Sequence, residues 1–419
     1  MRAARHLTNG ACAGILGLAV TTALLAQSGQ RGHNQIYNFG AQVGPTALTG
    51  TGNAVYGATQ VGGSQGVGSV YALTQPATPG GPWTYTTLYS FGSSPTDGST
   101  PFGLAIGGFS GSLPVLYGTT YSGGDFGRGT VFGLVPPQTP GGAWTEQILH
   151  SFDGTDGSGP EATVVVAMKT GALPVLYGTT LEGGASGDGA IFSLIPPTTQ
   201  GGAWTENVLY SFGSDPSGAG FPTKVVLGRG PGGPVLYGFT AVGGTNENGV
   251  VFSLAGAGNT WTFDVIYNIP PSNVTSSPTS LTIGNNGVLY GTEAPAFDVA
   301  DSYGEVYSLT PPTSEGGIWT ENTVYIFGAV ANDASNPAGL LMGTNGNLYG
   351  VTSGGGDGSG TVFALTPPAS PGGTWTETVL YRFPFNGETS GPSSLGVGPQ
   401  GALYGTTYYG DSTVFELQP

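Results

Sequence analysis

The chain has 419 residues, of which 79 are glycine and 32 are proline, and only 8% of its residues are charged. With 38% hydrophobic and 11% aromatic residues it is far too apolar for a disordered chain, and it has too few Lys, Glu and Arg for long amphipathic helices. A formal net charge of −16 excludes the basic surface that nucleic acids require. We therefore expect an acidic, all-β protein that binds no nucleic acid.

The first 26 residues have the pattern of a secretory signal peptide. Two arginines precede an apolar run over residues 11–26, which is shorter than the roughly 20 residues that span a bilayer. Cleavage after Ala26 leaves residues 27–419 as one domain, without a membrane span and without Cys12, the single cysteine. We expect bacterial export to the periplasm or the exterior, with retention of the apolar run as an anchor as the alternative.

The rest of the chain consists of seven copies of one unit. A Tyr-Gly pair recurs at steps of 53 to 61 residues, with its tyrosine at Tyr56, Tyr117, Tyr177, Tyr237, Tyr290, Tyr349 and Tyr404. Each pair lies in a short apolar run and is followed by a glycine-rich segment and a second run that ends in an aromatic residue. A third run begins at a tryptophan in six copies, and a weaker apolar run precedes each pair. These runs predict four short strands per unit, separated by turns.

Four-stranded units repeated seven times predict a seven-bladed β-propeller, in which each blade buries both faces against its neighbours. We name the strands of a unit A (weak run), B (Tyr-Gly run), C (second run) and D (Trp run). Only six D strands begin at a tryptophan, but residues 36–39 (Ile-Tyr-Asn-Phe) match the end of a D strand. We therefore predict a closed ring in which the N-terminal strand completes the last blade.

The repeat resembles a known family. The motif Leu-Tyr-Gly-Thr-Thr, followed by Gly-Gly, a glycine-rich spacer and Gly-Thr-Val-Phe, is similar to the GloVer tandem repeat of exported bacterial proteins. Residues 116–132 and 176–192 match best, the likeness extends over 34–417, and the copy at 290–307 departs from it where Glu293-Ala-Pro-Ala replaces Gly-Gly. The resemblance implies repeat architecture and export, and no established activity. Kelch propellers are a more distant likeness.

The D strands carry most of the conspicuous side chains. Each tryptophan precedes a Tyr or His by six residues, as Trp83 precedes Tyr89, and this even spacing predicts that the two share one face of the strand. The constant position of the tryptophans favours packing over sugar stacking. Four equivalent glutamates are interpreted as charges on an exposed strand edge that discourage aggregation: Glu146, Glu206, Glu321 and Glu377.

The two histidines beyond the signal, His33 and His150, do not predict a zinc or copper site, because no cysteine accompanies them. His150 takes the repeat's tyrosine position, so we expect it to pack. Among cofactors, calcium alone has a candidate site, at Asp153 and Asp156 in the segment Asp-Gly-Thr-Asp-Gly-Ser-Gly. That segment lacks the spacing and the downstream glutamate of an EF-hand loop.

The candidate binding surface is a face of acidic loops. In a propeller the D–A and B–C loops open on one face, and most of the 24 acids fall in them. Such a face attracts cations or a basic partner, although loop charges also serve solubility. The residues that we expect to bind a ligand there are Asp97, Asp125, Asp153, Asp156, Asp188, Asp333 and Asp357.

These observations favour an exported, monomeric, non-catalytic protein that binds a cation, a basic protein or a glycan. The first alternative is a polysaccharide hydrolase or lyase that acts through carboxylates. The second is a purely structural component of the cell envelope. Unlike polar side chains that converge at the ring centre would favour the enzyme.

Overall fold

The structure is a computed structural model, and it describes residues 32–418 apart from short segments. The residues outside the description are 1–31, 42, 47, 140, 170, 200, 258–259, 271–275, 296–302, 315, 329–332, 356–357, 371, 385–390, 399–400, 409–410 and 419. The predicted signal peptide, residues 1–26, therefore lies outside the described residues. The described part of the chain has no helix that is long and apolar enough to cross a membrane.

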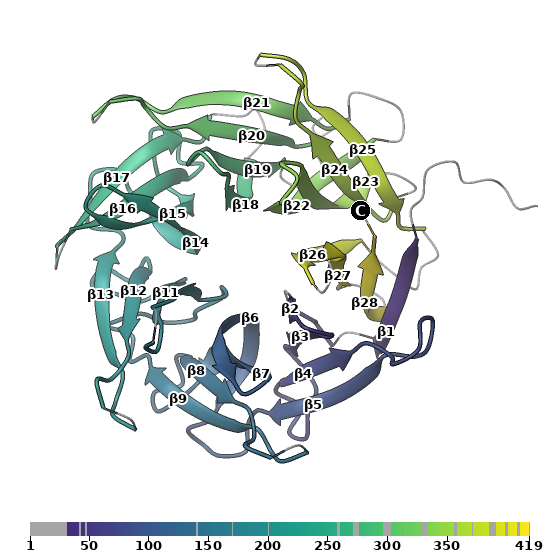
Figure 1. Ribbon diagram of the computed structural model, residues 1–419. Helices are drawn as coiled ribbons and strands as arrows, with labels where there is room; N and C mark the ends of the chain where they lie inside the picture. Colours follow the sequence, from purple (N-terminus) through teal and green to yellow (C-terminus); the bar gives the residue numbers. More distant parts are fainter. Residues whose placement is uncertain are drawn as a thin grey trace, which may run out of the picture.

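The described strands form seven antiparallel four-stranded sheets, which are arranged radially around one axis (Figure 1). From the inside outwards, blade 1 contains β2 (Thr49–Thr51), β3 (Ala54–Thr59), β4 (Ser69–Thr74) and β5 (Thr84–Ser90); blade 2 contains β6 (Gly98–Ser110), β7 (Leu113–Gly123), β8 (Thr130–Val135) and β9 (Thr145–Ser151); blade 3 contains β10 (Val165–Ala167), β11 (Val175–Thr180), β12 (Ala190–Ile195) and β13 (Thr205–Ser211); blade 4 contains β14 (Gly220–Gly230), β15 (Gly233–Val242), β16 (Val250–Ala257) and β17 (Thr260–Asn268). Blade 5 contains β18 (Ser276–Ile283), β19 (Leu289–Pro295), β20 (Glu305–Thr310) and β21 (Thr320–Ile326); blade 6 contains β22 (Ala334–Met342), β23 (Leu348–Gly355), β24 (Thr361–Thr366) and β25 (Thr376–Arg382); blade 7 contains β26 (Pro392–Val397), β27 (Leu403–Thr407), β28 (Asp411–Leu417) and β1 (His33–Ala41).

The N-terminal strand closes the ring, as predicted. β1 is the outermost strand of blade 7 and pairs antiparallel with β28, from His33 opposite Leu417 to Ala41 opposite Asp411. In Figure 1 the purple β1 lies beside the yellow β28. The seven-bladed, all-β fold is therefore confirmed.

The Tyr-Gly motif has a steric cause inside each blade. An aromatic ring of strand C lies across the glycine of strand B, so that a Cβ on Gly178 would lie 2.4 Å from Cζ of Phe192. In all seven blades the nearest ring atom would lie 2.2 to 2.6 Å from such a Cβ. The seven pairs are Gly57–Tyr71, Gly118–Phe132, Gly178–Phe192, Gly238–Phe252, Gly291–Tyr307, Gly350–Phe363 and Gly405–Phe415. A side chain on strand B would expel the ring from its place in the core.

A β-bulge in each outermost strand turns the end of that strand toward a different neighbour. In β5, Tyr89 pairs with Val70 and Thr87 with Tyr71, so Leu88 is the extra residue. The same register shift occurs in the outermost strand of every blade. Because the bulge reverses the alternation of side chains, the prediction that Trp83 and Tyr89 share one face is wrong.

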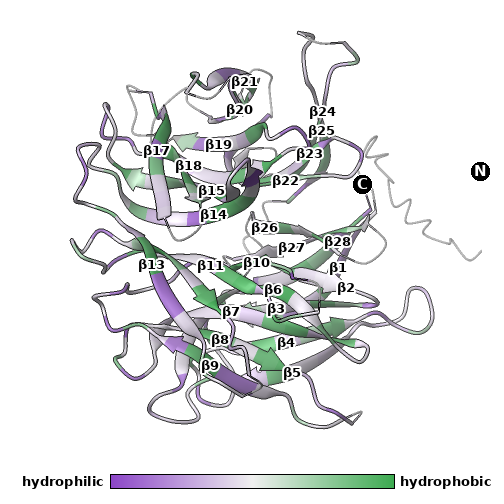
Figure 2. Ribbon diagram, turned by 60° about the vertical axis from the view of Figure 1, so that its left-hand side comes forward, coloured by the Kyte–Doolittle hydropathy of each residue, from purple (hydrophilic) through white to green (hydrophobic). Residues whose placement is uncertain are grey.

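The tryptophans pack between blades. Trp83 of blade 1 contacts Tyr404 of the preceding blade 7, with ring centroids 5.8 Å apart. Six junctions have this contact between a tryptophan and the Tyr-Gly tyrosine of the preceding blade, at 5.7 to 6.4 Å: Tyr404–Trp83, Tyr56–Trp144, Tyr117–Trp204, Tyr177–Trp261, Tyr237–Trp319 and Tyr290–Trp375. These contacts support the packing role. Figure 2 shows hydrophilic residues on parts of outer strands such as β9 and β13, with hydrophobic residues on the strands inside them.

Candidate functional site

Two of the predicted acids fasten loops instead of facing a ligand. Asp97 is 5% exposed and accepts hydrogen bonds from the Tyr89 hydroxyl (3.0 Å) and from the backbone N–H of Ser93 (2.9 Å) and Gly98 (2.8 Å). Asp333 is 7% exposed and makes the equivalent bond to Tyr325, at 3.2 Å. Each carboxylate therefore holds a D–A loop against its own D strand.

The other predicted acids do not form one site, and only Asp153 and Asp156 are bonded to each other among those that the structure describes. Asp125 and Asp153 are exposed, Asp188 is partly buried, and Asp357 lies outside the described residues. Within the described part of the chain, one group of three His, Asp or Glu side chains brings its ligand atoms together, and Asp156 is its only member from the predicted set. Ligand binding by the acidic face as a whole stays a prediction.

The calcium candidates are bonded within their own loop. Asp153 Oδ1 accepts hydrogen bonds from the backbone N–H and the hydroxyl of Thr155, both at 2.7 Å, and these bonds lower the pKa of Asp153. Asp156 Oδ1 accepts the backbone N–H of Asp153 at 2.9 Å, and its Oδ2 lies 2.8 Å from His150 Nε2. Each of the two carboxylates thus accepts a backbone N–H of the same turn. Calcium binding here stays a prediction.

The four D-strand glutamates are not exposed edge charges, and that prediction is wrong. Each stands two residues after a tryptophan and so shares its face, which packs on the preceding blade. Burial, followed by the charge of Asp97, raises the pKa of Glu146 to about 7. Burial and nearby aspartates raise the pKa of Glu206 and Glu377 to about 7 as well. Oε1 of each of these three glutamates is shielded from solvent and has no hydrogen-bond partner among the described residues.

The residue two positions after each tryptophan contacts the D-strand aromatic residue of the preceding blade. Around the propeller this residue is either a glutamate or a second aromatic residue. We call a junction a carboxylate seam where a glutamate fills the position: Tyr89/Glu146, His150/Glu206, Tyr267/Glu321 and Tyr325/Glu377. We call it a stacked seam where a second ring fills it: Tyr37/Tyr85, Tyr210/Phe263 and Tyr381/His33, with centroids 4.6, 4.3 and 3.8 Å apart. His33 therefore packs, and burial lowers its pKa to about 4.

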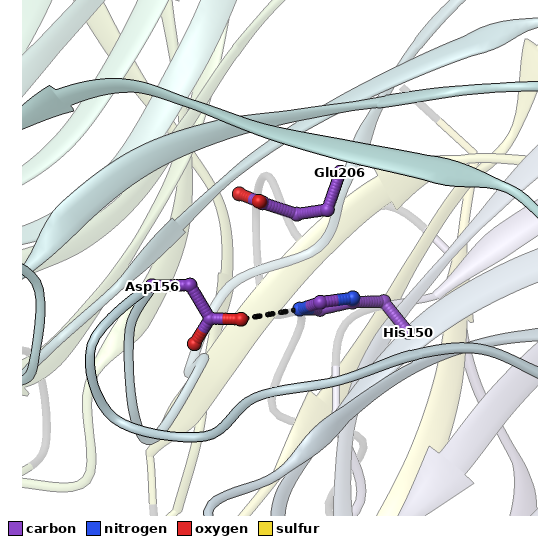
Figure 3. A group of neighbouring side chains, drawn as sticks. All are labelled: His150, Asp156 and Glu206. Atoms are coloured by element: carbon purple, nitrogen blue, oxygen red, sulfur yellow. Dashed lines mark hydrogen bonds and ion pairs between the residues drawn. The ribbon is translucent and has the colours of Figure 1, made fainter.

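One carboxylate seam has a histidine at the position where the other three have a tyrosine. His150 of β9, Asp156 of the following loop and Glu206 of β13 bring three ligand atoms within 4.8 Å of one another (Figure 3). His150 packs edge-on against Phe152, as its expected packing role requires, at a centroid distance of 4.8 Å. Its Nε2 also bonds Asp156, a contact that the sequence spacing did not predict.

The second candidate site is a cavity of about 540 Å³ among the innermost strands and the loops beside them. Blades 1 to 5 and blade 7 contribute lining residues, among them the aromatic residues Phe102 and Tyr408 and the hydroxyls of Thr163, Thr279, Ser393 and Ser394. Two residues of the described lining are charged, Lys224 and Glu161. Burial lowers the pKa of Lys224; burial, followed by the charge of Glu182, raises that of Glu161.

Lys224 breaks the repeat at the ring centre. It immediately precedes Val225, which pairs with Gly238 of the Tyr-Gly motif. The register places small residues at this position in five other blades: Gly103, Thr163, Ser280, Gly339 and Ser394. Sequence reasoning missed Lys224 because the A strands carry the weakest pattern, and the departure is visible only after alignment on the Tyr-Gly pairs.

The polar groups beside Lys224 are incompletely bonded. Within the described part of the chain the ammonium makes no ion pair or hydrogen bond. The neighbouring Thr223 Oγ1 is shielded from solvent and likewise has no partner among the described residues. Lys224 is partly buried, whereas the Thr223 hydroxyl is shielded, and a shielded polar group without a partner is rare, so a bound ligand is one natural explanation for this pair.

A protein-family model, described as the Gloeobacter/Verrucomicrobia repeat, matches residues 30–227, 115–317 and 235–419. The chain belongs to the Gloeobacter/Verrucomicrobia repeat family. The resemblance to the GloVer repeat is thereby confirmed, and the overlapping matches extend over all seven blades of this family member. No curated protein matches it in sequence.

Solved structures resemble this Gloeobacter/Verrucomicrobia repeat protein in fold. The WD40 β-propeller domain of Doa1 is 10% identical, with a TM-score of 0.50 over 92% of this chain and 97% of that one. A puromycin-hydrolysing peptidase of Mycobacterium tuberculosis is 13% identical, with a TM-score of 0.51 over 89% of this chain and 52% of that one. The extracellular domain of a protein described as a hybrid two-component system of B. thetaiotaomicron is 12% identical, with a TM-score of 0.50 over 91% of this chain. This chain spans 39% of that last structure. At these identities the likeness concerns the fold alone.

Proposed function

We propose that this protein is an exported, non-catalytic propeller that binds a small acidic saccharide, such as a uronic acid, in its central cavity. The observation that carries the proposal is Lys224, the one cation among the described residues that line the cavity, at a position that is Gly, Ser or Thr in five other blades. A partly buried ammonium without a partner among the described residues favours an anionic ligand, and hydrogen bonds to a charged group are stronger than neutral ones.

The rest of the lining suits a hydroxylated ring. Thr163, Thr223, Thr279, Ser393 and Ser394 supply hydroxyls that can donate and accept hydrogen bonds. Phe102 and Tyr408 add aromatic surface to the lining. A few polar groups in a mainly apolar concave site are typical of small-molecule binding.

A binding role fits the lining better than glycoside hydrolysis. Most glycosidases place two carboxylates on either side of the scissile bond. Glu161 is the only carboxylate among the described residues that line the cavity. The export part of the proposal rests on the pattern of residues 1–26.

Calorimetry with glucuronate, and with glucose as the neutral control, tests the proposal on the full chain. We expect glucuronate to bind more tightly than glucose, and Lys224→Met to weaken glucuronate binding by about 10-fold or more while glucose is unaffected. Arg229→Met, an exposed change on the same strand, should leave both affinities unchanged. Because the acidic loops repel an anion at long range, association should become faster as salt is raised.

Equal affinity for the two sugars, or no binding of either, would contradict the acidic-saccharide proposal. Release of reducing ends from polygalacturonate by the purified chain would contradict the non-catalytic role. Substituting Thr223→Val removes the unpartnered hydroxyl with little change in shape and should weaken glucuronate binding less than Lys224→Met does.

A further inference from the structure

The seam between blades 2 and 3 combines three different ligating groups. His150 ends β9, Asp156 lies in the loop that follows it, and Glu206 belongs to β13 of the next blade. In Figure 3 the three side chains point toward a common space, with the imidazole and the Asp156 carboxylate already in contact. We propose that these three side chains bind a divalent transition-metal ion, for which Zn²⁺ is the best match.

The geometry requires only a small adjustment. His150 Nε2 and Asp156 Oδ2 are 2.8 Å apart, and all three ligand atoms lie within 4.8 Å of one another. Zinc holds His nitrogen and carboxylate oxygen at about 2.0–2.2 Å, so its ligands are roughly 3–3.5 Å apart. A rotation of the long Glu206 side chain would close the difference, and the Asp156–His150 hydrogen bond would give way to two bonds to the ion.

Comparison with equivalent seams shows what the histidine changes. At two other seams, Tyr89 and Tyr325 donate a hydroxyl hydrogen bond to Asp97 and Asp333, opposite Glu146 and Glu377. Each of those seams therefore has two carboxylates and a phenol, which is not an ordinary zinc ligand. His150 replaces the phenol with an imidazole nitrogen in the same place. This one replacement completes a nitrogen–oxygen ligand set.

The local charges favour a cation. Oε1 of Glu206 is shielded from solvent and unpartnered within the described residues, so it offers a free lone pair toward the seam. Asp153 and Asp156 add negative charge beside it. Arg128 is the nearby cation, since a Cβ on Gly154 would lie 2.9 Å from its Nε. One guanidinium against three carboxylates leaves the seam negative.

The ligand set also selects the kind of ion. Calcium and magnesium prefer sites made of oxygen alone, whereas an imidazole nitrogen favours zinc and its transition-metal neighbours. Asp156 is held from behind by the backbone N–H of Asp153, which fixes the carboxylate for coordination. His150 and Asp156 are 20% and 18% exposed, so an ion and a bound water can reach them. Such an ion would bridge two blades and stabilise the folded ring.

Titration of the full chain, purified without a histidine tag, with ZnCl₂ tests the site. We expect one Zn²⁺ per chain, a higher Tm with zinc, and visible absorption bands of bound Co²⁺ when cobalt replaces zinc. Changing His150→Tyr installs the residue that the seams at Tyr89 and Tyr325 use, so it should fold. It should weaken Zn²⁺ binding by at least about 10-fold and abolish the cobalt bands.

Matched variants distinguish zinc binding at this site from nonspecific binding of zinc to other carboxylates. Glu206→Gln should weaken zinc binding as His150→Tyr does, whereas Glu146→Gln and Glu377→Gln, at the same repeat position, should not. Zinc affinity that survives both His150→Tyr and Glu206→Gln would overturn the proposal, as would no binding at millimolar Zn²⁺. Tighter binding of Ca²⁺ than of Zn²⁺, unchanged in His150→Tyr, would overturn it in favour of the Asp153–Asp156 loop alone.

Discussion

The seams at Tyr210 and Tyr325 pack a different kind of side chain against the same tyrosine position. In the first, Phe263 of the next blade stacks on the tyrosine at 4.3 Å, with an interplanar angle of 7°. In the second, Glu377 enters the same place, its pKa raised to about 7 by burial and by Asp333. The tyrosine hydroxyl donates to the loop aspartate in both, to Asp215 at 2.6 Å and to Asp333 at 3.2 Å.

Contact between neighbouring blades therefore does not depend on the residue that faces this tyrosine alone. Both seams keep a tryptophan on the preceding tyrosine, as in Tyr177–Trp261 and Tyr290–Trp375. The remaining position therefore tolerates either a ring or a carboxylate. The Tyr210/Phe263 seam gains apolar burial that does not depend on pH between 5 and 8, while a carboxylate seam contains a group whose ionised form is disfavoured there.

The largest expected effect comes from deleting residues 33–41, the whole of β1. This strand supplies one ring to each of two stacked seams, Tyr381/His33 and Tyr37/Tyr85, as well as the backbone pairing with β28. We expect Tm to fall by more than about 10 °C, or the protein to aggregate through the exposed strand edge. A peptide of residues 33–41 added in trans should restore part of the loss. A deletion variant that melts like the parent would refute the role of closure in stability.

Converting a stacked seam into a carboxylate seam should also destabilise the ring. Phe263→Glu removes a ring that contacts Tyr210, Phe212 and Phe252 and places a carboxylate near Asp215. Loss of a large aromatic side chain from a packed site costs about 3–5 kcal/mol. Tm should fall at pH 8 and recover in part at pH 5, where the new carboxyl is protonated. Phe263→Leu, as the uncharged control, should show a smaller fall with no such pH dependence.

Acidification should stabilise the three strongest carboxylate seams. The folded-state pKa of Glu146, Glu206 and Glu377 is about 7, above the ordinary 4.5, so the folded chain takes up protons more readily than the unfolded chain. The stabilisation is complete below about pH 4.5 and is lost as pH rises through about 7. Thermal melts from pH 8 to pH 5 should show a rising Tm. The triple variant with glutamine at the three positions should show a flatter profile, and an unchanged slope would refute the assignment.

The smallest expected effect is a gain in stability. Glu146→Tyr should convert the Tyr89 seam into a copy of the stacked Tyr37/Tyr85 seam. It removes a shielded carboxylate oxygen without a partner among the described residues and adds a ring pair worth about 0.5–1.5 kcal/mol beyond its burial. Tm at pH 8 should rise by a few degrees and depend less on pH. A lower Tm at pH 8 would show that the seam at Tyr89 lacks room for a second ring.

The repeat spacing predicted the strands, their order in each blade and the closing role of β1, because each of these depends on pattern alone. The bulge at Leu88 escaped prediction, since an extra residue is a property of pairing between two strands. Its trace in the sequence is an aliphatic residue directly before the aromatic one in every D strand, as in Leu88-Tyr89 and Leu149-His150. Two large side chains in succession interrupt the alternation that a regular strand would show.

The two candidate sites were harder to predict from the sequence than the fold. Glu206 stands two residues after Trp204, and this even spacing places both side chains on the face that packs in the seam. We instead expected the glutamate on an exposed outer edge, because the D strand is the outermost strand of its blade. The proximity of His150 to Glu206 depends on how consecutive blades pack, which no spacing encodes. Lys224 became conspicuous only through its register against β15.

The contact of each strand C ring with the strand B glycine is complete within a single blade. Unequal recombination between gene segments that encode neighbouring repeats would therefore deliver or remove a unit that already contains its own internal fit, as Gly118 and Phe132 do in blade 2. Only the junctions between units would have to be re-matched after such an event. The seven copies can accordingly diverge at one junction position, where a glutamate, a tyrosine, a phenylalanine or a histidine stands, while the motif inside each copy persists.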